Sequence, residues 1–173
     1  MELLLEEGAD IEARDRDGRT ALYQAAFIGH MAAVWILLER GADVEVTDKD
    51  GWPVLHAAVE RGNLRVIRLL LEKGANIEAR DRGGWTALHR AAINGHFAAL
   101  LLLLEHGANI EARDRSLYTP LHRAVFTNDE TIVRILLAKG ADAKARSFLG
   151  ETPLSEAIRA GFEELVVLLR LSE

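Results

Sequence analysis

The segment GANIEARDR, residues 74 to 82, sets the period of the whole chain. The same nine letters return at residues 107 to 115, and GADIEARDR, with one change, occupies residues 8 to 16. Glycines followed by alanine recur every 33 residues, at Gly8, Gly41, Gly74, Gly107 and Gly140. A leucine column keeps the same spacing, at Leu22, Leu55, Leu88, Leu121 and Leu154. A fixed period of this length predicts an array of similar units stacked side by side.

Each unit is predicted to hold two helices. The first opens at a threonine such as Thr119, a good N-cap, with Pro120 at the first helical position, where no N–H is needed. The second carries apolar residues three and four apart, as from Val66 to Leu71, and ends at the repeated glycine. Short polar turns join the units. One unit cannot bury its own apolar faces, so the units must stack.

The motif TPLHRA at residues 119 to 124, together with the 33-residue period, closely resembles the ankyrin repeat. The resemblance covers nearly the whole chain and implies an all-α solenoid of stacked helix-turn-helix units with projecting β-turn hairpins. It implies one domain, residues 1–173, whose parts are a half repeat at 1–14, full repeats at 15–47, 48–80, 81–113 and 114–146, and a C-terminal capping repeat at 147–173. In the family, turn tips and first helices line a concave face that usually binds a protein.

Three positions depart from the pattern. Pro53 stands where other units have the capping threonine, a change expected to lose roughly 1 kcal/mol of helix capping. Leu117 replaces the glycine at the turn tip, so that turn must bend differently or carry strain. Asn128 and Asp129 replace the usual Gly-His pair.

The composition excludes several kinds of protein. The chain has 173 residues, 49% of them apolar, a net charge of −6 and no cysteine, which excludes disulfide frameworks and thiolate chemistry. The acidic total argues against nucleic-acid binding. No apolar run is long enough to cross a membrane, and the first residues do not read as a secretory signal. We therefore expect an intracellular protein, cytoplasmic or nuclear, without membrane insertion.

No arrangement of residues points to catalysis. His56, His89 and His122 form one column, one per repeat, about 10 Å apart, whereas ligands of one zinc ion lie about 2 Å from it. The resemblance implies that this histidine braces the turn by hydrogen bonds. The glycines are spread through the units and form no phosphate-binding loop. We expect no enzyme, no metal and no cofactor.

The columns that vary between repeats are the candidate binding surface. The residue before the N-cap of each first helix is Arg19, Trp52, Trp85, Tyr118 or Glu151 in the successive repeats. In the family, this position faces the groove of the concave face. Aromatic residues and arginine are enriched at interface hot spots. The predicted partner-binding set is Trp52, Trp85, Tyr118, Phe27, Ile93, Phe126, Arg82, Arg90, Arg115 and Arg123. Two other interpretations stay open: the rings could cover the core, and neighbouring acids could balance the arginines.

The leading prediction is a non-catalytic protein–protein interaction module whose partner carries an acidic or phosphorylated segment beside an apolar anchor. One alternative is a module that binds a ligand or single-stranded nucleic acid through stacked rings and arginines. Another is an engineered binding scaffold. Trp35 and Leu101, on the outward side of the second helices, form a secondary apolar surface that is either a second interface or adventitious.

The pattern of the N-terminal segment predicts the second helix of a repeat, with no first helix before it. Leu3, Leu4 and Leu5 would then have a neighbour on one side only, and an apolar face of this kind is normally covered. The sequence therefore predicts that the chain is a fragment of a longer array or that this end associates with another molecule, a second copy included.

Overall fold

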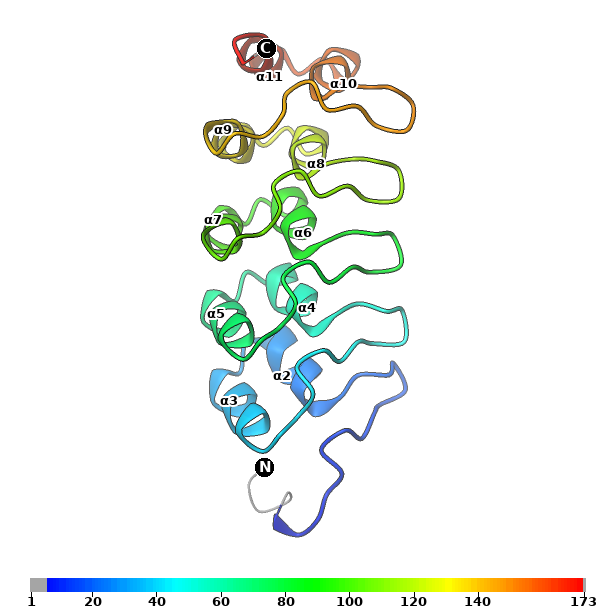
Figure 1. The fold of residues 1–173 in the computed structure, drawn as a ribbon, viewed down its shortest axis with the longest axis vertical. Helices are drawn as coiled ribbons and strands as arrows, with labels where there is room; N and C mark the ends of the chain where they lie inside the picture. Colours follow the sequence, from blue (N-terminus) through cyan, green and yellow to red (C-terminus); the bar gives the residue numbers. More distant parts are fainter. Residues whose placement is uncertain (1–5, 173) are drawn as a thin grey trace.

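The structure, a computed structural model that describes residues 6–172, is a stack of five helix pairs (Figure 1). The expected all-α solenoid is confirmed. The first helices of the pairs are α2 (Ala21–Ile28), α4 (Val54–Glu60), α6 (Ala87–Ile93), α8 (Pro120–Phe126) and α10 (Pro153–Ala160). The second helices are α3 (Met31–Glu39), α5 (Leu64–Glu72), α7 (Phe97–Glu105), α9 (Glu130–Ala138) and α11 (Glu163–Arg170).

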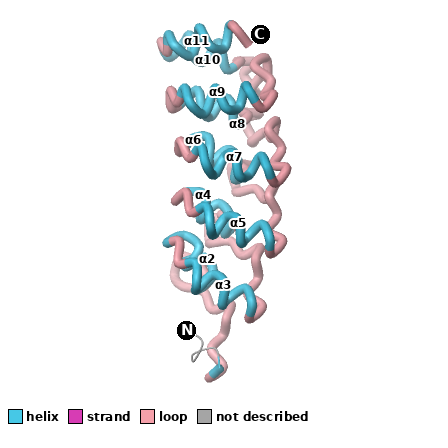
Figure 2. The backbone as a smooth tube through the Cα atoms, turned by 90° about the vertical axis from the view of Figure 1, so that its left-hand side faces the viewer, coloured by secondary structure: helices cyan, strands magenta, loops and turns pink. Residues whose placement is uncertain are grey.

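The elements lie in three layers. In Figure 1 the second helices are on the left, the first helices in the middle, and the turns between repeats project to the right. Figure 2 shows the pairs stacked one above another along the long axis. The buried leucines Leu22, Leu55, Leu88 and Leu121 run through the middle layer, and alanines such as Ala26 and Ala92 let neighbouring helices approach closely. This core holds the turns in a regular row.

The tip of each turn needs a residue in the left-handed conformation. Gly84 has a φ of 79°, and a side chain there would meet the backbone nitrogen of Arg115 at 2.9 Å. Leu117 occupies the same column and adopts the same conformation, with a φ of 61°. The turn therefore keeps its shape and carries strain, since the left-handed region costs an L-residue other than glycine roughly 1–2 kcal/mol.

A glutamate column joins each repeat to the next. The Oε1 atom of Glu12 accepts the backbone N–H of Asp43 at 2.8 Å, and Glu45 accepts that of Asn76 at 2.7 Å. The same bond recurs from Glu78 and Glu111 to the repeats that follow them. Each bond satisfies a backbone donor in a turn and fixes the register between two neighbours.

The histidine column braces the turns, as expected. The Nε2 atom of His89 lies 3.0 Å from the carbonyl oxygen of Tyr118 in the next turn, and Nδ1 lies 2.9 Å from the hydroxyl of Thr86 and 3.2 Å from its nitrogen. Because a carbonyl can only accept, Nε2 carries the proton and Nδ1 accepts. His122 makes the same contacts with Thr119 and Glu151.

Pro53 disturbs this arrangement in the second repeat. His56 keeps its bond from Nε2 to the carbonyl of Ala79, 3.0 Å away. Proline offers neither an N–H nor a hydroxyl, and within the described residues Nδ1 of His56 is buried without a partner. Helix α4 also has no side-chain cap, which agrees with the loss of capping expected at this position.

Pro53→Thr is expected to stabilise the protein by about 1 kcal/mol. Threonine supplies two hydrogen-bond donors to His56, each contributing roughly 0.5–1.5 kcal/mol. Part of this gain is offset because the unfolded chain becomes more flexible when proline is removed. The backbone of Pro53, at φ −64° and ψ 151°, suits threonine without change. Urea denaturation measures the difference. Pro53→Val restores the N–H alone and should give less than half the gain; equal stability of Pro53→Thr and the wild type would contradict the argument.

The leucines of the N-terminal half repeat, Leu3 to Leu5, lie outside the described residues, so association through this end remains a prediction. Among the helices that the structure describes, none combines the length and the apolar character needed to span a bilayer.

Candidate functional site

Aromatic rings and guanidinium groups alternate along the stack where the turns meet the first helices. The guanidinium carbon of Arg90 lies 3.7 Å from the ring centre of Trp52 and 4.6 Å from that of Trp85. One repeat further, that of Arg123 lies 4.0 Å from Trp85 and 4.8 Å from Tyr118. We call Trp52, Arg90, Trp85, Arg123, Tyr118 and Phe126 the aromatic–arginine ladder. Cations placed over ring faces in this way attract the rings electrostatically.

Phe126 closes the ladder on its C-terminal side. Its ring meets that of Tyr118 edge-on, with 5.1 Å between the centres, and the guanidinium carbon of Arg123 lies 5.6 Å from it. Phe126 is partly exposed, and Trp85 and Tyr118 are half-buried. The rings thus pack against the arginines on their faces and leave part of their surface exposed.

The two ladder arginines are also structural. Arg90 donates to the carboxylate of Asp81 at 2.6 Å, and the side chains are 16% and 3% exposed; Arg123 pairs with Asp114 in the same way. Burial acts to raise the pKa of the Asp81 carboxyl, but hydrogen bonds from Arg90 and from the backbone N–H groups of Trp85 and Gly83 hold it below its ordinary value. The rings cover the faces of these guanidinium groups and the aspartates balance their charge, so both arginines hold the ladder together and add little net charge to its surface.

The other four predicted site residues are not among the ring and guanidinium contacts that define the ladder. Phe27 belongs to a separate contact at the N-terminal end, where the guanidinium carbon of Arg61 lies 4.5 Å from its ring centre. Ile93 is half-buried at the end of α6. Arg82 and Arg115 are exposed at the tips of the turns. Six of the ten predicted residues thus form one continuous surface.

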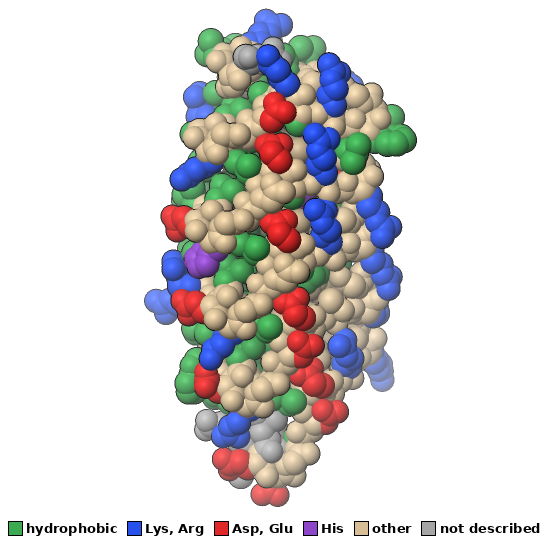
Figure 3. Space-filling view, in the orientation of Figure 1, with side chains coloured by type: hydrophobic (Ala, Val, Ile, Leu, Met, Phe, Trp, Pro, Cys, Tyr) green, Lys and Arg blue, Asp and Glu red, His purple; other side chains and the backbone are tan. Residues whose placement is uncertain are grey.

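Charge changes along the row of turn tips. Lys49 pairs with Asp17 of the preceding tip at 2.5 Å, and Arg82 lies 3.7 Å from Asp50. In the turn tip that precedes Arg115, Gly83 stands in the position that Asp17 and Asp50 hold in the earlier tips. In the described chain, no carboxylate lies within 4.0 Å of Arg115. Figure 3 shows basic side chains in rows along the turns. The positive charge of Arg115 is therefore unbalanced at its turn tip.

The ladder ends at a buried carboxylate. Glu156 takes the position of Arg90 and Arg123 in the last repeat, is almost fully buried, and accepts from Arg159 at 2.8 Å. Burial and the neighbouring Glu151 carboxyl raise the pKa of Glu156. Sequence reasoning missed this change of sign, although comparing position 156 with 90 and 123 would have found it.

The last turn tip was missed as well. Phe148 and Leu149 are 76% and 74% exposed and stand where earlier tips carry arginine, lysine, aspartate, glycine or serine. Figure 3 shows hydrophobic side chains protruding from the edge of the upper turns. The signal was present in the tip column, which changes from Arg115 to Phe148.

Across residues 6–172, no cluster of three or more histidine or acidic side chains could hold a metal ion. Burial lowers the pKa of His56 and of His89 to about 4 in each case, so both rings are neutral at pH 7. These histidines are held in the turns by hydrogen bonds and do not face the groove as acids or bases.

Comparison with known proteins gives one result. A family model described as ankyrin repeats (3 copies) matches the chain over residues 1–81, 33–114, 78–147 and 115–172. No curated protein matches the chain significantly.

Proposed function

The chain belongs to the ankyrin-repeat family, whose repeats are generally non-catalytic protein–protein interaction modules, and from that premise we propose that it binds a protein partner on its concave face through the aromatic–arginine ladder. The observation that carries the proposal is the continuity of the ladder across three repeats, from Trp52 to Tyr118. Hot spots of interfaces are enriched in tryptophan, tyrosine and arginine packed in this manner.

The charges beside the ladder support a particular partner chemistry. Arg90 and Arg123 are neutralised by their aspartates, so long-range attraction is expected mainly from the exposed Arg115 and less from the exposed Arg82, which lies 3.7 Å from Asp50. Both exposed arginines lie at the tips of the turns that carry Trp85 and Tyr118. This arrangement fits a segment that places an apolar anchor against the rings and a carboxylate or phosphate near the tips.

The alternative, a site for a ligand or single-stranded nucleic acid, is disfavoured by the packing of the rings. Nucleic-acid bases stack on exposed aromatic faces. In the ladder, the space between Trp52 and Trp85 already holds Arg90, and the space between Trp85 and Tyr118 holds Arg123. A base could stack there only by displacing an arginine from its ion pair.

Trp85→Ala is expected to weaken partner binding by more than about 1 kcal/mol, a loss of about fivefold or more in affinity. The probe is a peptide selected against the wild-type protein from a random library, and its affinity for each variant is measured by fluorescence polarisation. The matched control is Trp35→Ala, which removes an exposed tryptophan on the opposite side of the helices. Tyr118→Ala tests a second ring of the ladder and should also weaken binding.

Thermal unfolding of the same variants separates binding from packing. We expect Trp85→Ala to remain folded at the temperature of the assay. If it lowers the melting temperature sharply and leaves the affinity unchanged, the rings serve as cover for the core. A loss on Trp35→Ala alone would place the peptide on the other face and contradict the proposal.

A further inference from the structure

Large apolar side chains lie exposed on the face of α3, α5 and α7 that is opposite the turns. Trp35, Leu64 and Phe97 are 51%, 39% and 55% exposed. Met31, Leu64 and Phe97 are the first residues of α3, α5 and α7, whereas the first residue of α9 is Glu130. The apolar surface is therefore continuous over three adjacent helices and is interrupted at α9. We call it the outer helix face.

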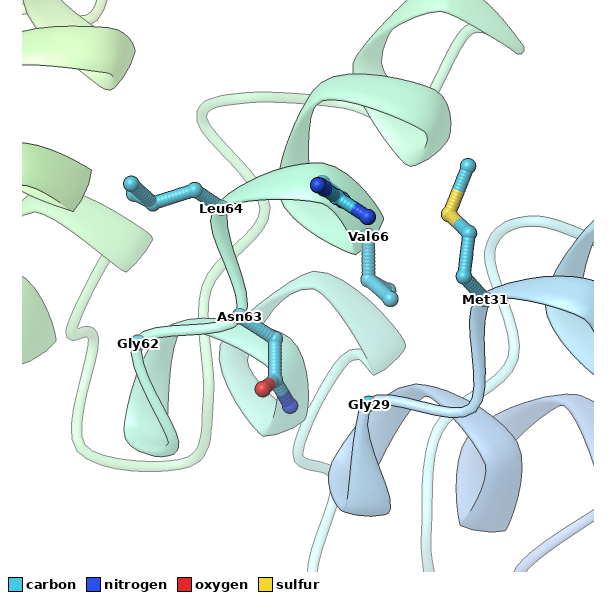
Figure 4. A pocket seen from close by; sticks show the side chains of 7 residues that line it. Gly29, Met31, Gly62, Asn63, Leu64 and Val66 are labelled. Atoms are coloured by element: carbon cyan, nitrogen blue, oxygen red, sulfur yellow. The ribbon is translucent and has the colours of Figure 1, made fainter.

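Two furrows cross the outer helix face. One, with a volume of about 320 Å³, lies between α3 and α5 and is lined by Met31, Leu64 and Arg68. The other, of about 200 Å³, lies between α5 and α7 and is lined by Leu64, Arg68, Phe97 and Leu101. Figure 4 shows the corner where the first furrow opens, with Met31 and Leu64 at the starts of their helices and Leu64 pointing away from Met31. Because they line both furrows, Leu64 and Arg68 form the ridge between them.

The spacing of the furrows matches the repeat of an α-helix. Packed helices lie about 8–10 Å apart, so the two furrows are separated by about that distance. An α-helix rises about 1.5 Å per residue, which puts side chains at positions i and i+7 about 10.5 Å apart on one face. A helix lying along the stack can therefore place one side chain in each furrow. Its side chains at i+3 and i+4 then lie over the ridge.

The ridge carries positive charge. Arg65 and Arg68 are exposed, and in the part of the chain that the structure describes no carboxylate lies within 4.0 Å of either guanidinium. Glu72 and Glu105 line the far ends of the furrows and would repel an acidic helix from there. The charges thus favour a carboxylate over the ridge, near the N-terminal ends of α5 and α7.

We propose that the outer helix face is a second docking site, for an acidic amphipathic helix that places apolar side chains at i and i+7 in the two furrows and a carboxylate at i+3 or i+4 over Arg68. Helices docked in apolar grooves are recognised through such regularly spaced anchors. This site is separate from the aromatic–arginine ladder and does not depend on the function proposed above.

The test uses two synthetic helical peptides of about 18 residues, with leucine at i and i+7 and either glutamate or lysine at i+3 and i+4. Fluorescence polarisation with the wild-type protein should show about tenfold tighter binding of the glutamate peptide. Phe97→Ser should weaken that binding, because it removes one wall of the second furrow. Arg68→Glu should reverse the preference in favour of the lysine peptide.

The matched control is Arg134→Glu, which makes the same change in the same column on α9, away from both furrows. It should leave both affinities unchanged, as should Trp85→Ala in the ladder. Equal binding of the two peptides, or an unchanged preference in Arg68→Glu, would overturn the proposal. The proposal would also be overturned if light scattering showed a dimer of the chain that Phe97→Ser dissociates, because a second copy would then occupy this face.

Discussion

Acidification from pH 7 to pH 4 is expected to remove about 3 kcal/mol of unfolding free energy for each of the buried histidines His56 and His89. Their pKa is about 4 in the folded protein against 6.5 in the unfolded chain, and each unit of difference corresponds to about 1.4 kcal/mol. The pKa of His122 is lowered in the same direction by burial. For a domain at the lower end of the ordinary range of stability, roughly 5–15 kcal/mol, this loss is enough to unfold it.

The sign follows from proton binding. Between pH 6.5 and pH 4 the unfolded state binds a proton on each of these histidines and the folded state does not, so stability falls as the pH falls. Glu156 acts in the opposite direction within part of this window, because its raised pKa makes the folded state bind the extra proton. One such carboxyl does not offset three histidines.

Urea denaturation at a series of pH values measures the effect. His89→Gln removes one titrating ring and should reduce the dependence on pH between 6.5 and 4 by about one proton. The control is His106→Gln, because His106 is exposed at the end of α7. If His89→Gln keeps the full dependence, the histidine column is not its source.

Arg90→Ala is expected to destabilise the protein by about 3 kcal/mol, which is typical of removing one partner from a buried ion pair. The Asp81 carboxylate is 3% exposed and would be left charged without Arg90. The faces of Trp52 and Trp85 would also lose the cation that lies between them. Chemical denaturation gives the change in unfolding free energy.

Two further variants identify the cause. Asp81→Asn combined with Arg90→Ala removes the unpaired charge and keeps an oxygen for the N–H groups of Gly83 and Trp85, so it should recover part of the loss. Arg115→Ala, at an exposed tip, should change stability by less than about 0.5 kcal/mol. Equal losses in Arg90→Ala and Arg115→Ala would mean that the buried pair contributes nothing specific.

The fold could be predicted because the signals for it are local and repeated. The spacing of Gly74 and Gly107 gives the unit, and Thr119 with Pro120 marks the start of a helix. For Leu117 the sequence predicted one of two outcomes, a turn of different shape or the same turn with backbone strain, and did not decide between them. The structure keeps the bend, because the turn is held by its neighbours on both sides.

The site could be predicted only in part. The aromatic column from Trp52 to Tyr118 was visible, because these residues vary where the framework does not. Residue types alone did not reveal that Arg90 turns back to an aspartate nine positions earlier in the chain. A long side chain can reach several partners, and the choice depends on which carboxylate is buried within its range. The sequence therefore left open whether Arg90 is a free or a paired charge, and in the structure it pairs with Asp81.

The glutamate column bears on how such a chain can grow. Each bond of this column joins one side chain, as in Glu45, to a backbone amide, as in Asn76, and every residue except proline supplies that amide. A repeat can then be duplicated, lost or exchanged without a matching substitution in its neighbour. The near-identical segments at residues 8 to 16, 74 to 82 and 107 to 115 are compatible with such copying or with design. Duplication or deletion of whole repeats can therefore change the length of the array, while the glutamate-to-amide bonds between repeats stay the same.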